Sequence, residues 1–183
     1  QLTSYLNKFS LMPSIQSGFR VGHSTETTLV KLYNDLILSA DKGNLSVLLC
    51  LDFSSVFHTA DHSVLLSVLE KSFSVSGSSF SWFQSCLSNR SRYVVLNASK
   101  SDPVTFDYGI PQGSILGPLL FILYTSELPQ IISSFFLNSQ FYADDFYIYS
   151  SSPKSSLNCF KQISSYCLEK IMSWSTSMYL KLN

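Results

Sequence analysis

The chain has few of the features by which several protein classes are recognised. Only 13% of its 183 residues are charged, and no apolar run approaches the roughly 18 residues that a membrane-spanning helix needs. The longest candidate, Ile115 to Tyr124, is short and contains Gly117 and Pro118. The first residues lack the basic cap and apolar region of a secretory signal. The sequence therefore indicates no membrane partner and favours an intracellular protein of the nucleus and cytoplasm.

Cysteine is scarce as well, and its spacing is uninformative for metal binding. None of the four cysteines stands in a CxxC pair, which excludes the usual zinc-knuckle and thiol-redox motifs. In a reducing compartment we expect these residues to be small buried hydrophobic side chains. They are Cys50, Cys86, Cys159 and Cys167.

A surplus of positive charge is also missing, since 12 basic residues balance 12 acidic ones. Nucleic-acid-binding proteins usually carry a basic surplus, so the composition counts against a stand-alone protein of that class. It does not count against one part of a longer protein whose basic segments lie elsewhere. The chain begins at Gln1 and ends at Asn183 inside an alternating apolar pattern, which favours such a fragment.

The sequence is rich in apolar and aromatic residues, arranged with two periodicities. Hydrophobic residues make up 45% of the chain, with 14 Phe and 10 Tyr, enough for the core of one globular domain. This arrangement predicts an α+β fold with helices packed on a mainly antiparallel sheet. The predicted helices cover residues 24–41, 61–73, 80–87, 113–128 and 157–174, and the predicted strands cover 46–53, 92–98, 104–107, two halves of 140–149, and 178–182.

Two of these segments carry detailed expectations. The helix over 24–41 begins at Ser24 or Thr25 and ends at Gly43. Its spacing places one set of residues on the inward face, namely Leu29, Leu32, Tyr33, Leu36, Ile37 and Ala40. The strand over 46–53 is continuously apolar, which is typical of a buried central strand.

Three acidic residues stand in unusually apolar surroundings. Asp52 ends the apolar strand, and the adjacent Asp144 and Asp145 lie inside an aromatic hairpin. An ionised carboxylate is costly there unless a cation or a hydrogen-bond donor compensates it. A divalent metal ion would reverse the mutual repulsion of the pair. Oxygen ligands without His or Cys suit Mg²⁺.

Each acidic feature also has an ordinary structural interpretation. An Asp at a strand end is commonly a cap, and an Asp-Asp pair is commonly a solvated turn. Neighbouring side chains of a strand face opposite ways, so Asp144 and Asp145 reach the same metal site only if the hairpin turns there.

Several segments, taken in order, resemble the successive sequence blocks of reverse transcriptases from non-LTR (LINE-type) retrotransposons. Together they cover nearly the whole chain. The segments are QSGFRVGHST (16–25), LDFSSVFHTADHSVLL (51–66), GIPQGSILGPLLFILY (109–124), FYADD (141–145) and SWSTSMYLKLN (173–183).

The resemblance implies the palm of a right-hand polymerase, incomplete at both ends, with residues 1–45 as the end of the fingers region and 46–183 as the palm. It implies an RNA-directed DNA polymerase that adds dNTPs to a primer 3′-hydroxyl, with an RNA template and a DNA primer as partners. Two Mg²⁺ ions would be bound by Asp52 and Asp144, with help from Asp145 and the backbone carbonyl of Phe53.

The resemblance also implies substrate contacts. Phe57 follows Asp52 by five residues, where a ring would exclude a ribose 2′-hydroxyl; an ordinary core Phe is the equal alternative. Gln112 and Gly113 lie in a turn that opens a helix and suits contact with the incoming nucleotide. Arg20 either binds a phosphate or the template, or pairs with an acid.

One position departs from the family pattern. His58 stands where the family usually has Asp, and that Asp is not an expected metal ligand. His58 and His62 have helical i, i+4 spacing, but without a third ligand nearby they do not predict a metal site. The alternatives to a polymerase are an inert retrotransposon relic or domesticated interaction domain, and another palm-type enzyme such as a nucleotidyl cyclase.

Overall fold

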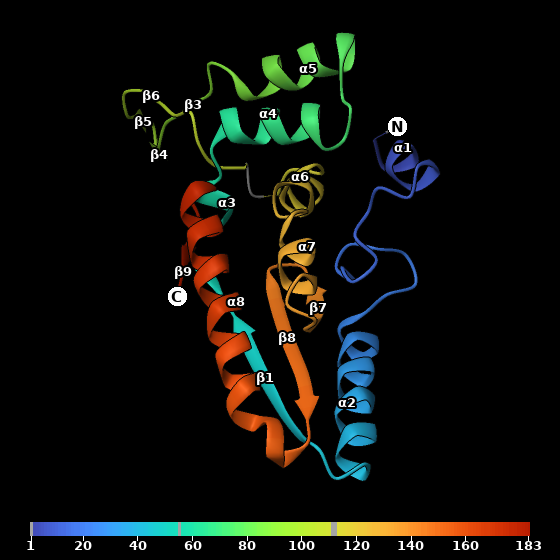
Figure 1. Cartoon of the computed structure of the whole chain (residues 1–183). Helices are drawn as coiled ribbons and strands as arrows, with labels where there is room; N and C mark the ends of the chain where they lie inside the picture. Colours follow the sequence, from blue (N-terminus) through green and yellow to red (C-terminus); the bar gives the residue numbers. More distant parts are fainter. Residues whose placement is uncertain (1, 55, 111–112) are drawn as a thin grey trace. The chain divides into compact units, whose positions relative to one another are not determined.

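The computed structural model describes residues 2–54, 56–110 and 113–183, and Figure 1 shows the course of the chain. The chain forms two compact units. The first, called the sheet unit below, consists of Gln1–Ser55 and Thr125–Asn183; the second, the helical unit, is Val56–Tyr124. No described helix is long and apolar enough to cross a membrane. The predicted division into fingers and palm at residue 45 stays a prediction.

The sheet unit contains most of the strands and the longest helices. Its elements are α1 (Leu2–Lys8), α2 (Thr25–Asp41), β1 (Leu45–Leu51), β2 (Phe53–Ser54), α7 (Leu128–Ser133), β7 (Asn138–Tyr142), β8 (Asp145–Ser152), the 3-10 helix η1 (Lys154–Ser156), α8 (Leu157–Ser177) and β9 (Lys181–Leu182). The helical unit contains α3 (Val56–Thr59), α4 (His62–Lys71), α5 (Gly77–Leu87), β3 (Ser91–Arg92), β4 (Val95–Leu96), β5 (Ser99–Lys100), β6 (Val104–Thr105) and α6 (Gly117–Tyr124).

An antiparallel three-stranded sheet is the centre of the sheet unit. Its strand order is β1-β8-β7, and in Figure 1 helices α2 and α8 flank these strands. An aromatic cluster forms its core: the Phe146 ring lies 4.6 Å from that of Phe141 and 5.2 Å from that of Phe53. Trp174 of α8 packs edge-on to Phe53 at 6.3 Å. These contacts confirm the predicted α+β class with helices on an antiparallel sheet.

The prediction that residues 46–53 form a buried central strand was wrong about position. The segment is a strand, but β1 is the outer strand of the described sheet, and β8 is the central one. Within β1 only Leu51 is buried, while Leu45, Leu48 and Cys50 are exposed. An apolar run shows that both faces tolerate burial, but pairing decides which strand is central.

Helix α2 begins and ends as predicted, but its buried face agrees only in part with the predicted one. The Ser24 hydroxyl accepts a hydrogen bond from the Thr27 N–H, completing a capping box. The buried residues are Thr28 and Leu32, whereas most of the predicted face, including Tyr33, is exposed. Thr28 can be buried because its hydroxyl donates to the Ser24 carbonyl at 3.0 Å. Hydrophobic spacing therefore predicted the burial of Leu32 correctly but missed Thr28 and included four exposed residues.

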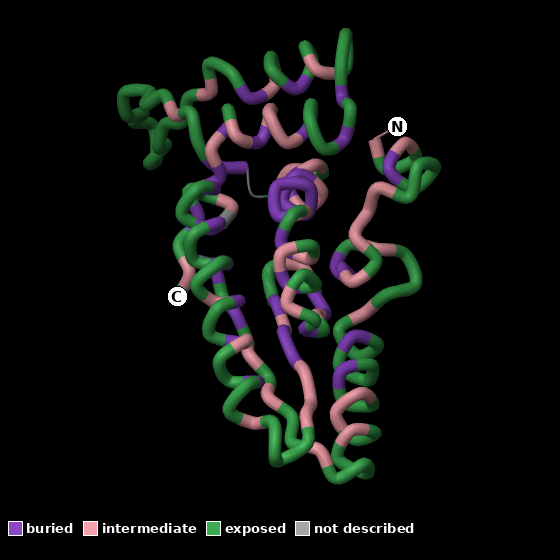
Figure 2. Tube along the Cα trace, viewed as in Figure 1, coloured by how far each residue is buried: buried purple, intermediate pink, exposed green. Residues whose placement is uncertain are grey.

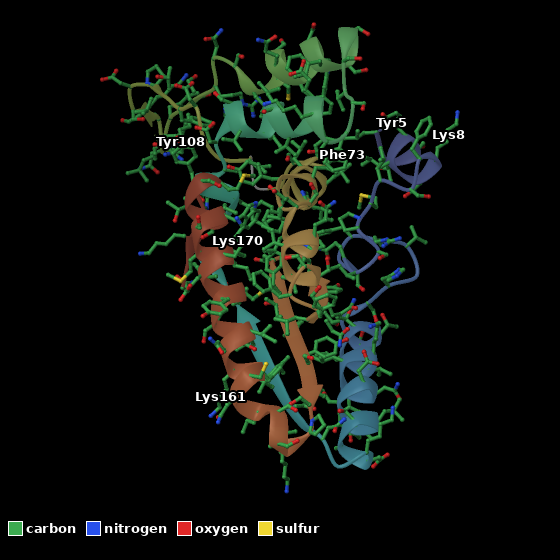
Figure 3. The ribbon with its side chains drawn as sticks, in the orientation of Figure 1. Tyr5, Lys8, Phe73, Tyr108, Lys161 and Lys170 are labelled. Carbon is green, nitrogen blue, oxygen red and sulfur yellow. The ribbon has the colours of Figure 1, made fainter. Side chains whose placement is uncertain are left out.

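The helical unit has a core of its own. Asp61 caps α4 by accepting from the Val64 N–H, and Leu65 and Leu69 are fully buried on this helix. Figure 2 shows α6 as an almost continuous buried segment. Phe73, labelled in Figure 3, follows α4 and is buried.

Two predicted elements of the helical unit differ from the structure. The predicted strand over 92–98 is broken into β3 and the β4–β5 hairpin, whose two-residue turn starts at Asn97 with φ 54°. Asn adopts this left-handed conformation more readily than most residues, which permits the turn. The predicted helix over 113–128 begins only at Gly117, which puts Pro118 in the first turn, where proline is tolerated.

The prediction that all four cysteines are buried was mostly wrong. Only Cys167 is buried, Cys86 is intermediate, and Cys50 and Cys159 are exposed; all four are free thiols. Of the strand predicted over 178–182, only Lys181–Leu182 is present, as β9, which pairs antiparallel with the upstream β2; Met178 caps α8 instead.

Candidate active site

Strand pairing in the sheet unit brings the three predicted carboxylates together. β1 pairs with β8 through Leu51 and Phe146, so Asp52 is level with Asp145, the first residue of β8. Tyr142 of β7 pairs with Asp145, which leaves Ala143 and Asp144 as the hairpin turn. The hairpin therefore turns at the acidic pair, as the metal hypothesis requires.

The three carboxylates interact electrostatically. Partial burial raises the pKa of Asp145 above its ordinary value, and the negative charges of Asp144 and Asp52 raise it further. All three residues are exposed to solvent. A cation at this edge would relieve the repulsion and favour the charged form of Asp145.

The donor set fits a magnesium site that substrate completes. Among the described residues, no group of three or more His, Cys, Asp or Glu side chains is arranged to hold a metal ion by itself. Mg²⁺ in nucleotide-processing enzymes is bound by one or two carboxylates together with substrate phosphates and water, rather than by a cage of protein ligands. The carboxylates of Asp52 and Asp144 satisfy that requirement.

Asp52 is held by a residue that the sequence did not single out. The Asn183 side-chain amide donates to Asp52 Oδ2 at 2.6 Å, and the Asn183 backbone N–H donates to the Asp52 carbonyl at 2.9 Å. This contact follows from the pairing of β9 with β2, in which Phe53 is opposite Leu182. The Phe53 side chain is buried in the aromatic cluster.

The Ala143–Asp144 turn is strained and is held by Gln16, a second residue to which the sequence assigned no role. Ala143 has φ 53°, a left-handed conformation that costs a residue with a Cβ about 1–2 kcal/mol. The Gln16 amide donates to the Ala143 carbonyl at 3.1 Å and accepts from the Ala143 N–H at 3.0 Å. Sequence reasoning placed Gln16 in a family-like block but could not assign this contact, because the two residues are far apart in the chain.

Arg20 contacts backbone carbonyls rather than an acid, and its alternative role at a phosphate or the template stays a prediction. Its guanidinium donates to the backbone carbonyls of Pro13 and Gln16, each at 3.2 Å. Arg20 thus stabilises the segment that contacts the turn.

The lysines of α8 labelled in Figure 3, Lys161 and Lys170, are exposed.

The remaining predicted site residues belong to the helical unit. The Phe57 ring packs 5.3 Å from that of Phe121 and is half-buried, so its place beside a nucleotide sugar stays a prediction. Gly113 is exposed and has φ 78°, a conformation that favours glycine. Gln112 lies outside the described residues, and its role also stays a prediction.

The two histidines with i, i+4 spacing have different environments. The His62 ring is buried and its Nε2 lies 2.8 Å from the Gly109 carbonyl oxygen, a hydrogen bond within the helical unit. His58 is exposed on the short helix α3. His58 in place of the usual Asp therefore disturbs no buried packing.

A small antiparallel sheet flanked by helices, with carboxylates at a strand end and on its hairpin, is the arrangement expected of a polymerase palm. The comparison with family models agrees. The chain belongs to the reverse transcriptase (RNA-dependent DNA polymerase) family, whose model matches residues 1–183. Polymerases of this family generally use divalent metal ions.

The most informative relatives are encoded by transposons of Drosophila melanogaster. The chain is 30% identical over 129 residues to a probable RNA-directed DNA polymerase from transposon BS, covering 70% of this chain and 14% of that protein. It is 29% identical to the probable RNA-directed DNA polymerase from transposon X-element, a match that covers 79% of this chain and 16% of that protein. It is also 29% identical to the RNA-directed DNA polymerase from mobile element jockey, a match that covers 64% of this chain and 13% of that protein. The chain thus spans a small part of the curated relatives that it matches.

Solved structures share the fold at low sequence identity. Apo telomerase from Candida tropicalis aligns with TM-score 0.62 and 16% identity, covering 90% of this chain and 35% of that one. Telomerase from Candida albicans, in complex with a fragment of telomeric RNA, aligns with TM-score 0.58 and 14% identity, covering 100% and 33%. These likenesses establish the fold.

Proposed function

We propose that this chain supplies the catalytic palm of an RNA-directed DNA polymerase, which extends a DNA primer with dNTPs on an RNA template. The observation that carries the proposal is the pairing of β1, β7 and β8, which puts Asp52 level with Asp145 and beside Asp144. Membership of the reverse transcriptase family and the transposon-encoded relatives support the same activity.

In this proposal Asp52 and Asp144 bind two Mg²⁺ ions, with Asp145 and the Phe53 backbone carbonyl assisting. The ions, when bound, would lower the pKa of the primer 3′-hydroxyl and neutralise charge on the triphosphate. The protein's part is to fix the carboxylates where the substrate phosphates complete the site. Asp52 is held by Asn183, and Asp144 is held by the turn that Gln16 contacts.

The repulsion at Asp145 supports metal binding at this place. Its pKa is raised by burial and by two neighbouring carboxylates, so the site without a cation is electrostatically unfavourable. Phe57, Gln112 and Gly113 remain the proposed contacts to the incoming nucleotide.

The test is incorporation of dNTPs on an RNA template with a DNA primer and Mg²⁺. We expect Asp144→Ala to abolish incorporation, because it removes a proposed metal ligand. Asp41→Ala is the matched control, since Asp41 is an exposed carboxylate of the same unit at the end of α2. Equal incorporation by all three chains would refute the assignment of Asp144.

If none of the three chains incorporates dNTPs, the result favours the inert relic or interaction domain. The same assay with rNTPs and without template would separate a polymerase from a nucleotidyl cyclase, because a cyclase releases a cyclic nucleotide and needs no template.

A further inference from the structure

We infer that Gln16 is a positioning residue for catalysis: its side-chain amide fixes the Ala143–Asp144 turn and thereby the placement of the catalytic aspartates. The inference rests on the proposed function and adds a residue from outside the strands that bear the carboxylates. Gln16 belongs to the segment between α1 and α2, which lies beside β7 in Figure 1.

The backbone of this segment pairs with β7 like a short parallel strand. The Phe141 N–H donates to the Ile15 carbonyl at 2.9 Å, and the Ser17 N–H donates to the Phe141 carbonyl at 2.8 Å. This pairing stops at Phe141, two residues before the turn. The Gln16 side chain therefore starts from a fixed backbone position directly beside the catalytic hairpin.

The Gln16 amide continues that pairing onto the turn. Its Nε2 donates to the Ala143 carbonyl, and its Oε1 accepts from the Ala143 N–H. The side-chain amide therefore pairs with Ala143 as a backbone peptide group would. Oε1 also accepts from the Gly18 N–H at 2.8 Å. Gln16 is only 1% exposed, so its side of these hydrogen bonds is shielded from water, whereas Ala143 is half-buried.

The turn needs such support, because Ala143 holds a left-handed conformation without being glycine. Close packing adds to the hydrogen bonds. A Cβ added at Gly18 would lie 2.2 Å from the Ala143 nitrogen, so only glycine allows the segment to approach this far. The turn is thus bonded by Gln16 and covered by Gly18, and the next residue after Ala143 is the proposed metal ligand Asp144.

A matched control exists in the same contact. Gln140 is likewise buried and donates to the Ile15 carbonyl at 3.0 Å and to the Ser17 hydroxyl at 2.8 Å. It ties the same segment to β7, but these bonds do not involve Ala143. Gln16→Met and Gln140→Met each remove a buried amide from one interface, and only the first releases the turn.

The experiment compares both variants with the unaltered chain in three measurements. Hydrogen exchange of the Ala143 amide should be about tenfold faster in Gln16→Met alone, because only there is its acceptor lost. Affinity for Mn²⁺, measured from the paramagnetic resonance of the free ion, should fall severalfold in Gln16→Met alone. In the incorporation assay kcat should fall roughly 10- to 100-fold, with the primer-template KM nearly unchanged.

The outcomes are distinguishable from failure of the proposed function. If the unaltered chain binds Mn²⁺ but incorporates no dNTP, the polymerase proposal fails, while exchange and Mn²⁺ affinity still decide the role of Gln16. An Ala143 amide that exchanges at the same rate in all three chains would overturn the inference. Equal losses of kcat in both variants would also overturn it, and a chain that binds no Mn²⁺ even with primer-template and dNTP present would overturn both proposals.

Gln16→Glu covers the case in which Gln16→Met does not fold. It keeps the oxygen that accepts from Ala143 and Gly18, loses the donor to the Ala143 carbonyl, and places a second acceptor oxygen against that carbonyl, with a negative charge when it is ionised. We expect the Ala143 amide to stay protected while kcat falls by a smaller factor. Wild-type kcat in this variant would overturn a role for the bond from Nε2.

Discussion

Asp145 is a residue whose charge is unfavourable for folding and which we propose assists metal binding. Its carboxylate is partly buried beside Asp144 and Asp52, and its pKa is raised for that reason. The folded chain therefore binds this proton more tightly than the unfolded chain does. In the absence of metal, the contribution of Asp145 to stability falls as the pH rises from the ordinary aspartate value of about 4 through the raised folded pKa.

Replacing this residue tests both properties. We expect Asp145→Asn to raise the free energy of unfolding in EDTA at pH 7, by less than about 1 kcal/mol because the group is largely exposed. We also expect it to lower incorporation. Chemical denaturation at pH 4 and pH 7 measures the first effect, and the gain should be larger at pH 7.

Asp102→Asn is the charge-matched control, since Asp102 is exposed in a loop of the helical unit. It should change neither stability nor incorporation. A loss of stability at pH 7 in Asp145→Asn would show that the carboxylate makes favourable contacts that outweigh the repulsion.

At the level of elements, α2 is attached to the sheet by a polar contact as well as by its few buried residues. Most of its apolar side chains are exposed, including Leu29, Val30 and Tyr33. The Tyr149 hydroxyl of β8 donates to Asp35 Oδ2 at 2.6 Å, and Lys31 lies 3.4 Å from the same oxygen. Burial and the bond to Asp35 raise the pKa of Tyr149, which keeps the phenol protonated.

Removing that hydroxyl should loosen α2 from the sheet. We expect Tyr149→Phe to lower the free energy of unfolding by about 1.5–3 kcal/mol, because a half-buried carboxylate loses its neutral donor. Thermal or urea denaturation measures the change. Tyr147→Phe removes the same atom from the same strand and should cost less than about half as much; an equal cost would show that the Asp35 contact is not the cause.

For the whole molecule, the four free cysteines report which parts are packed. Cys50 and Cys159 are exposed, whereas Cys167 is buried on α8. Burial raises the pKa of the Cys167 thiol to about 11, so its reactive thiolate is scarce at pH 8. The fold therefore predicts unequal reactivity among chemically identical groups.

Thiol labelling with mass spectrometry checks this pattern on the intact chain. We expect Cys50 and Cys159 to react first with a maleimide at pH 8, and Cys167 to react only as the chain unfolds. Labelling in urea is the control, where all four should react at similar rates. Rapid labelling of Cys167 in buffer would mean that α8 is not packed as described.

The sequence by itself determined part of the local structure and singled out the acidic residues Asp52, Asp144 and Asp145. Capping at Ser24, the hairpin around Asp144 and the amphipathic helix α8 follow from turn chemistry and periodicity, which act between residues close in the chain. Motif order also predicted the family that the comparison establishes.

Only the tertiary structure decided what depends on residues distant in the chain. The outer position of β1, the inward face of α2, and the contacts of Gln16 with Ala143 and of Asn183 with Asp52 are of this kind. The physical reason is that a strand's pairing partner, and the acceptor of a buried amide, are chosen among all surfaces that folding brings together. Local periodicity is the same whichever partner is chosen.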